Sequence, residues 1–228
     1  MTLYVLLNII IIAAPAALSF DKRVAYVKRW PRVFLTIFIV GGIYIFWDVF
    51  AAARGDWSFN SRYSGAVKLF GLPLGELLFF FTVPFSCIFI YEVVRGYFKE
   101  REVAFPLWLS YLLAAGSIAG AVIFRGRPYT FTVLLVFAGF LILGEILRLF
   151  RSFQFWFFLG LSMVAFIIFN SILTSLPIVS YGKEAILNIR AGTIPIEDFF
   201  YNISLLGYGA IVFNLLEKPF SKKRRTEK

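Results

Sequence analysis

Long apolar runs separated by short polar segments make up most of the chain. Each run is close to the roughly 20 residues that a helix needs to cross a bilayer. Three runs begin at Pro73, Pro106 and Pro195, and we expect these prolines in the first helical turn, where a missing N–H is tolerated. The chain is therefore expected to be an all-α, polytopic membrane protein, with seven transmembrane helices at about Leu3–Phe20, Val33–Ala53, Pro73–Val94, Pro106–Phe124, Tyr129–Leu147, Phe153–Leu173 and Pro195–Leu216.

The first run, Leu3–Phe20, could also be read as a secretory signal. No basic residue precedes it, and Asp21-Lys-Arg23 follows where a cleavage site would be expected. We therefore expect this segment to be retained as the first of the seven helices.

Basic residues are distributed unevenly between the two sides of the predicted bundle. Loops 21–32, 95–105 and 148–152, with the tail from Glu217, carry 16 Lys and Arg, against 7 for the N-terminus and the other loops. The excess, which includes Lys222-Lys-Arg-Arg225, predicts a multi-pass cell-membrane protein with a cytoplasmic C-terminus and an outer N-terminus. Because the net charge of +10 comes from residues that flank apolar segments, we expect contact with lipid headgroups and no nucleic-acid partner.

Composition narrows the possible chemistry. The chain is 60% apolar with a mean hydropathy of +0.82, which exceeds the balance of soluble domains. It has no histidine, and Cys87 is its one cysteine, so histidine-based triads, imidazole metal sites and disulfides are excluded. Acid–base chemistry must fall to Asp, Glu, Lys, Tyr or bound water. No glycine-rich nucleotide loop is present, and we expect neither a metal nor a cofactor.

Two apolar helices begin with a proline followed by acidic residues. The sequences are Pro73-Leu-Gly-Glu76 and Pro195-Ile-Glu-Asp198. A charged side chain costs about 2.5 to 3.5 kcal/mol near the centre of a membrane helix, so a functional role is the first interpretation. The alternative is structural, since acids also stabilise the positive end of a helix dipole.

An offset of 122 residues superposes the two halves of the chain. It relates Pro73 to Pro195, Glu76 to Asp198 and Asp48 to Asn170. A fourth helix between two copies of three would leave the copies parallel, related by a pseudo-two-fold axis along the membrane normal. We therefore predict a first repeat at residues 1–104, a linking helix at 105–128 and a second repeat at 129–228.

Several polar residues are predicted to lie at one depth in the bundle. Asp48 lies near the end of its helix and Glu76 near the start of the next, so antiparallel packing brings them to the same level. Asn170 stands in the same relation to the acids of the second half. We therefore expect one polar layer at Asp48, Glu76, Asn170, Glu197 and Asp198.

The remaining helical acids and the long loops have simpler interpretations. Glu92, Glu145 and Glu217 lie beside basic residues near the cytoplasmic helix ends, where we expect ion pairs with Arg95, Arg148 and Lys218 respectively. Loops 54–72 and 174–194 are expected to fold over the opposite end of the bundle, near the acids. An inert interfacial helix is the alternative for these loops.

Several motifs resemble the membrane-integral lycopene cyclases, which occur as heterodimers or fused domains. In the first half they include Phe46-Trp-Asp48, Trp57-Ser-Phe-Asn60 and Tyr63. In the second half they include Leu176–Tyr181 and Gly192–Asn202. The resemblance implies that the chain cyclises the linear carotene lycopene to β-rings within the membrane, as an isomerase or intramolecular lyase without net redox change.

The resemblance also implies site residues. Glu76, Glu197 and Asp198 match catalytic acids, and our hypothesis makes Asp198 or Glu197 the proton donor with Glu76 and Asp48 as partner charge or base. Gly75 stands where the family has a further acid, which leaves open whether both halves contribute equally or whether only one end of the substrate is processed efficiently. The supporting or substrate-binding residues are expected to be Asp48, Asn170, Trp47, Asn60, Tyr63, Tyr201 and Asn202.

Other function classes remain to be weighed against this one. A retinal protein is excluded because no lysine lies between Pro195 and Leu216. A prenyl-transfer enzyme stays open as an alternative, although the Asp-rich motifs that it would need for Mg²⁺-diphosphate do not occur. A carotenoid-binding or transport protein stays open, as do the number of rings formed, the carotene used and self-association.

Overall fold

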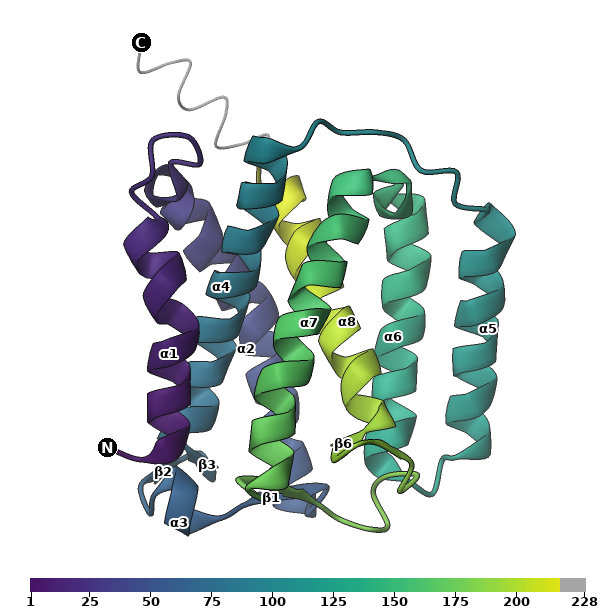
Figure 1. The fold of residues 1–228 in the computed structure, drawn as a ribbon. Coiled ribbons are helices and arrows are strands. Elements are labelled where there is room, and N and C mark those ends of the chain that lie inside the picture. Colours follow the sequence, from purple (N-terminus) through teal and green to yellow (C-terminus); the bar gives the residue numbers. More distant parts are fainter. Residues whose placement is uncertain (218–228) are drawn as a thin grey trace.

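The structure, a computed structural model, describes residues 1–217. It is mostly helical, and the part described contains seven helices of 16 to 25 residues (Figure 1). They are α1 (Leu3–Leu18), α2 (Trp30–Arg54), α4 (Leu74–Tyr97), α5 (Leu107–Ile123), α6 (Pro128–Ile146), α7 (Phe153–Ser175) and α8 (Ile196–Leu215). All seven predicted segments are confirmed as helices, with ends that shift by a few residues. The basic tail at Lys222–Arg225 lies outside the described residues.

Within residues 1–217, four helical segments are long and apolar enough to cross a membrane. They are Tyr26–Arg54, Leu74–Tyr97, Pro128–Ile146 and Phe153–Ser175, the first of which joins the short 3₁₀ turn Tyr26–Arg29 to α2. Helices α1 and α5 are apolar but shorter. The structure thus supports a helical membrane protein, and a complete set of seven spans stays a prediction.

The three prolines expected in first helical turns lie one position earlier. Pro73, Pro106 and Pro195 are the N-cap residues of α4, α5 and α8, with ψ angles of 154°, 126° and 143°. These extended ψ values exclude the prolines from the helices. The prediction was wrong by one residue because Pro73 and Pro195 each also end a short strand.

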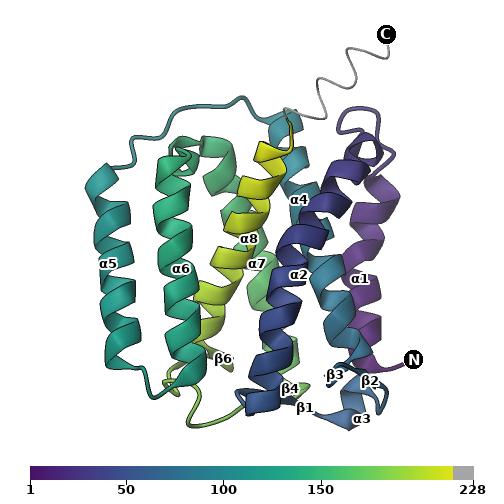
Figure 2. The same ribbon diagram turned by 180° about the vertical axis from the view of Figure 1, so that it is seen from behind.

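The helices form a bundle in which α4 and α8 are central. Helix α1 packs on α4, α2 packs on both α4 and α8, and α5 lies at the far edge beside α6 (Figures 1 and 2). Aromatic rings fill much of the interior, including Phe89, Phe140, Phe155 and Phe213. Gly207 permits this packing, because a Cβ at that position would lie 2.0 Å from the Phe140 ring.

Short strands close one end of the bundle. Strand β1 (Trp57–Phe59) pairs antiparallel with β4 (Val179–Tyr181), so that Ser58 lies opposite Ser180. Two hairpins precede the acidic helices: β2 (Lys68–Leu69) with β3 (Leu72–Pro73), and β5 (Arg190–Ala191) with β6 (Ile194–Pro195). The two long loops therefore fold over this end as expected, and their helical content is limited to the single turn α3 (Ser61–Ser64).

Ion pairs gather at the opposite end. Glu92 contacts Arg95 at 2.8 Å, as predicted, and also Arg29 at 3.2 Å and Arg32 at 3.4 Å. Glu217 pairs with Arg95 at 2.9 Å and Arg32 at 3.4 Å. Its expected partner, Lys218, lies outside the described residues. This cluster connects α2, α4 and the end of α8.

The expected pair between Glu145 and Arg148 is not formed. Glu145 accepts a hydrogen bond from Ser110 at 2.8 Å and lies 3.9 Å from Arg151. Arg148 leaves the end of α6 with a left-handed φ of 56°, and the 3₁₀ turn Leu149–Arg151 then brings Arg151 towards the acid. The basic residue nearest Glu145 is therefore Arg151, three positions after the predicted Arg148.

Candidate active site

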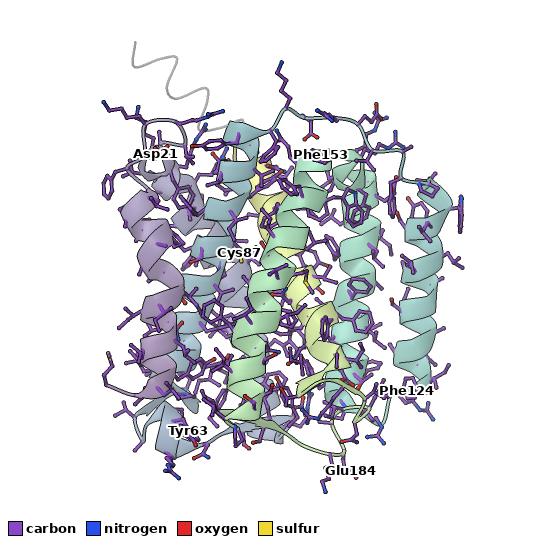
Figure 3. The ribbon with its side chains drawn as sticks, viewed as in Figure 1. Asp21, Tyr63, Cys87, Phe124, Phe153 and Glu184 are labelled. Atoms are coloured by element: carbon purple, nitrogen blue, oxygen red, sulfur yellow. The ribbon has the colours of Figure 1, made fainter. Side chains whose placement is uncertain are left out.

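A cavity of about 210 Å³ lies between α1, α4, α7 and α8, starting at the end closed by the strands. Its walls run along α4 from Glu76 to Ile90, roughly 20 Å at 1.5 Å per residue. Cys87 lines it, between the depths of Tyr63 and Asp21, which mark the two ends of the bundle (Figure 3). Carboxyl, hydroxyl and amide groups gather near the strands, whereas the remaining lining is mostly apolar.

Asp198 has the best-satisfied carboxylate in the cavity. Tyr129 donates to Oδ1 at 2.8 Å, while Tyr181 and Asn170 donate to Oδ2 at 2.6 Å and 2.8 Å. These donors come from α6, β4 and α7, so the strand cap and two helices fix one carboxylate. Three hydrogen bonds to a carboxylate stabilise its negative charge.

Tyr181 remains a donor over a wide pH range. Burial, and then the neighbouring Asp198 carboxylate, raise the pKa of the Tyr181 hydroxyl well above its usual value. The hydroxyl therefore keeps its proton under ordinary conditions and can donate it in the hydrogen bond to Asp198.

Glu76 has one hydrogen-bond donor, Tyr4. The Tyr4 hydroxyl donates to Oε2 of Glu76 at 2.6 Å. Asn8, one turn further along α1, donates to the carbonyl oxygen of Gly75 at 2.9 Å and thereby holds the start of α4 against α1. Glu76 also interacts electrostatically with Asp48 and Asp198, so the three acids affect one another's charge.

Asp48 is only half satisfied. Trp57 Nε1 donates to Oδ1 at 2.6 Å, and the buried Oδ2 has no partner within residues 1–217. An ionised carboxylate with such an oxygen is costly to bury. Protonation of Asp48 would reduce that cost, because a neutral carboxyl group is cheaper to bury and can donate a hydrogen bond.

Glu197 lies apart from the other acids. Its Oε1 accepts hydrogen bonds from Thr130 Oγ1 and from the backbone N–H of Leu187, both at 2.7 Å. It does not line the cavity, whereas Asp198 does. Consecutive residues of a helix point about 100° apart, so both acids cannot face the same space. The predicted polar layer is therefore divided between two environments.

Among the predicted supporting residues, Asp48, Asn170, Tyr201 and Asn202 line the cavity. Asn202 donates to the sulfur of Met163 at 3.2 Å. The Tyr201 hydroxyl makes no hydrogen bond within the described part of the chain, and it interacts electrostatically with Asp48, Glu76 and Asp198.

The other three supporting residues do not line the cavity. The Trp47 ring packs 5.0 Å from that of Tyr201, between centroids. Asn60 caps α3 by accepting a hydrogen bond from the Arg62 N–H, and Tyr63 packs on the apolar cluster beside Tyr4. Each of them shapes the strand end without reaching the acids.

Four donors to the acids that line the cavity were not among the predicted site residues: Tyr4, Trp57, Tyr129 and Tyr181. The resemblance motifs contain Trp57 and Tyr181, but no role was assigned to either. Tyr4 and Tyr129 lie in the first turns of α1 and α6, at the end of the bundle that also carries the acids. Estimating depth for tyrosines as well as for carboxylates would have found them.

The acids have no basic partners in the described residues. No ion pair there involves Asp48, Glu76, Glu197 or Asp198. Likewise, no group of three or more acidic or cysteine side chains within residues 1–217 is arranged to hold a metal ion. The hydrogen bonds to the acids come instead from tyrosine, tryptophan, threonine and amide donors.

Comparison with known proteins gives one family. A family model described as lycopene cyclase matches residues 1–94 and 126–216. The match covers most of the chain, which therefore belongs to the lycopene cyclase family. The family implies a carotenoid substrate, and the apolar helices indicate a membrane protein. No match was found among curated proteins or among solved structures.

Proposed function

We propose that the chain is a lycopene β-cyclase, which converts acyclic ends of lycopene to β-rings within the membrane. The observation that carries the proposal is the unequal hydrogen bonding of three acids in one apolar cavity. Asp198 has three donors, whereas Glu76 and Asp48 have one each. Such an arrangement separates a charged carboxylate from a protonated one within reach of the same ligand.

The chemistry requires a donor and an acceptor of protons. A proton added to the terminal trisubstituted alkene gives a tertiary cation. The neighbouring double bond then forms a carbon–carbon bond to that cation, which closes the ring and moves the charge into it. Loss of a ring proton restores a double bond. One proton is added and one removed, so the step is an isomerisation without oxidant or reductant.

The hydrogen bonds favour Glu76, sharing its proton with Asp48, as the acid. Protonation of this pair relieves the partnerless oxygen of Asp48, and transfer of the proton to the alkene leaves a charge that Tyr4 and Trp57 can stabilise. Asp198, whose charged form its three donors stabilise, would stabilise the cation and accept the ring proton. These roles reverse our sequence-based hypothesis, in which Asp198 or Glu197 was the donor.

We further propose the parallel repeats and the outer location of the N-terminus. The hairpins ahead of α4 and α8 begin at Lys68 and Arg190, 122 residues apart, and the matched family ranges end at 94 and 216, also 122 apart. Ser58 pairs with Ser180, its own equivalent under this offset. A pseudo-two-fold axis through that pair would relate residues 1–104 to 129–228, with α5 in the linking segment.

Product analysis tests the function. Purified protein in liposomes that contain lycopene should convert it to carotenes with β-rings, identified by chromatography and by their absorption spectra, while liposomes without protein should not. Lycopene that is bound but recovered unchanged would contradict the proposal and favour a binding or transport protein.

A further inference from the structure

The 122-residue offset predicts a second cavity. The open cavity has walls from α1, α4, α7 and α8, and the offset relates these helices to α6, α8, α2 and α4 respectively. A counterpart should therefore lie between α2, α4, α6 and α8. Whether this counterpart is open or filled decides how many ends of a linear substrate one chain can process at once.

Larger side chains occupy five of the counterpart positions, whereas Cys87 and Leu173 of the cavity correspond to the smaller Gly209 and Ala51. Ser86 of the cavity corresponds to Tyr208, and Leu7 corresponds to Tyr129. Other pairs change in the same direction: Pro15 to Phe137, Val83 to Leu205 and Phe169 to Trp47. At these five positions, the counterpart side chain fills more space than its equivalent in the cavity.

Three of these larger groups, Trp47, Leu205 and Tyr208, belong to one apolar cluster. The Tyr201 ring lies 5.1 Å from that of Tyr44 and 5.0 Å from that of Trp47, between centroids. Val40 and Leu205 are buried in the same cluster, and Tyr208 packs against it with its hydroxyl donating to the Val136 carbonyl at 3.1 Å. This core occupies most of the counterpart region, and a cavity of about 10 Å³ remains beside Val40 and Leu205.

The acids that line the cavity all lie at one end of the bundle. Asp48, Glu76 and Asp198 line the cavity near the strands. At the opposite end, Glu92 and Glu217 are held by arginines. Within residues 1–217, an extended carotene with one end at the cavity acids therefore has no second cavity-lining acid for its other end.

On this basis, and resting on the proposed function, we infer that each chain has one site for an acyclic end group. A substrate with two such ends is released after the first ring forms and must bind again in the reverse direction. The second half of the chain completes the first site instead of forming its own.

A time course with trapping tests this inference. Labelled lycopene in excess over wild-type protein in liposomes should give free monocyclic carotene before bicyclic carotene. A tenfold excess of unlabelled monocyclic carotene should lower the label in the bicyclic product about tenfold by mass action. Exclusively monocyclic product would support one end per binding event equally well.

Two results would overturn the inference. Labelled bicyclic product that forms from the first turnovers and is insensitive to the trap would show that both ends react without release, while the proposed function would stand. Absence of any cyclic product would instead contradict the proposed function, and the inference with it.

A pair of substitutions on α7 locates the site independently. Ala165→Phe fills the cavity and should reduce cyclisation more than tenfold, whereas Ile168→Phe adds the same ring to the outer face, where Ile168 is 55% exposed, and should leave the rate unchanged. Equal rates in the two variants would show that the end group does not react in this cavity.

Discussion

The ring of Tyr4 occupies the space that a side chain at position 75 would need. A Cβ built on Gly75 would lie 2.5 Å from Cγ of Tyr4. The same tyrosine donates its hydroxyl hydrogen to Glu76 at 2.6 Å. The first half therefore has a tyrosine packed on a glycine where the second half has Glu197, which gives a physical reason for the departure from the family pattern.

Gly75→Ala should destabilise the protein through this contact. Overpacking of this kind costs about 1 to 3 kcal/mol, since the Tyr4 ring must move away from α4. The loss should nearly disappear in a Tyr4→Ala background, where the space is free. Thermal unfolding of wild type, the two single variants and the double variant in detergent measures the coupling between positions 4 and 75. Additive losses of stability would contradict the proposed contact.

Removal of one donor to Asp198 should slow cyclisation. Tyr181→Phe deletes a hydrogen bond to a charged group, worth about 1.5 to 3 kcal/mol, which corresponds to roughly a ten- to hundredfold lower rate. Tyr63→Phe provides the control, because Tyr63 packs at the same end of the bundle and does not line the cavity. Initial rates in liposomes would decide, and equal rates would exclude a role for the Tyr181 hydroxyl.

Glu197→Gln should retain most of the activity, within about twofold of wild type. The glutamine oxygen can still accept from Thr130 and Leu187, and its amide replaces an oxygen that has no partner in the described residues. Product formation and thermal stability should be measured together. A loss of product formation without a loss of stability would contradict this prediction and show that Glu197 has a catalytic role.

The ion cluster at the opposite end should make stability depend on pH. Burial raises the pKa of Glu217, but its hydrogen bonds and ion pairs with Arg95 and Arg32 outweigh burial and hold the pKa below its usual 4.5. An acid with a lowered folded-state pKa stabilises the fold above its unfolded pKa and loses that contribution as pH falls. The melting-temperature difference between wild type and Glu217→Gln should be constant near neutrality and shrink below about pH 4.5. A constant difference down to pH 3 would contradict this.

The apolar runs alone were sufficient to predict the helices and the shared depth of Asp48, Glu76 and Asp198. They could not distinguish Glu197 from Asp198, because the face that α8 turns towards the cavity depends on its neighbours. Tyr4 and Tyr129 were missed since a tyrosine near a helix end is typical of any membrane interface. The pairing of β1 with β4 was also missed, because two three-residue segments far apart in the chain carry no periodic pattern.

The central claim is that an acid from each half acts on one end group in one cavity. The most direct test compares Glu76→Gln and Asp198→Asn in a lycopene-accumulating host, with protein levels measured in the same membranes. General acid–base groups contribute typically 10² to 10⁴ in rate, so each variant alone should accumulate normally and give almost no β-ring product. Near-normal cyclisation by either single variant would contradict the account.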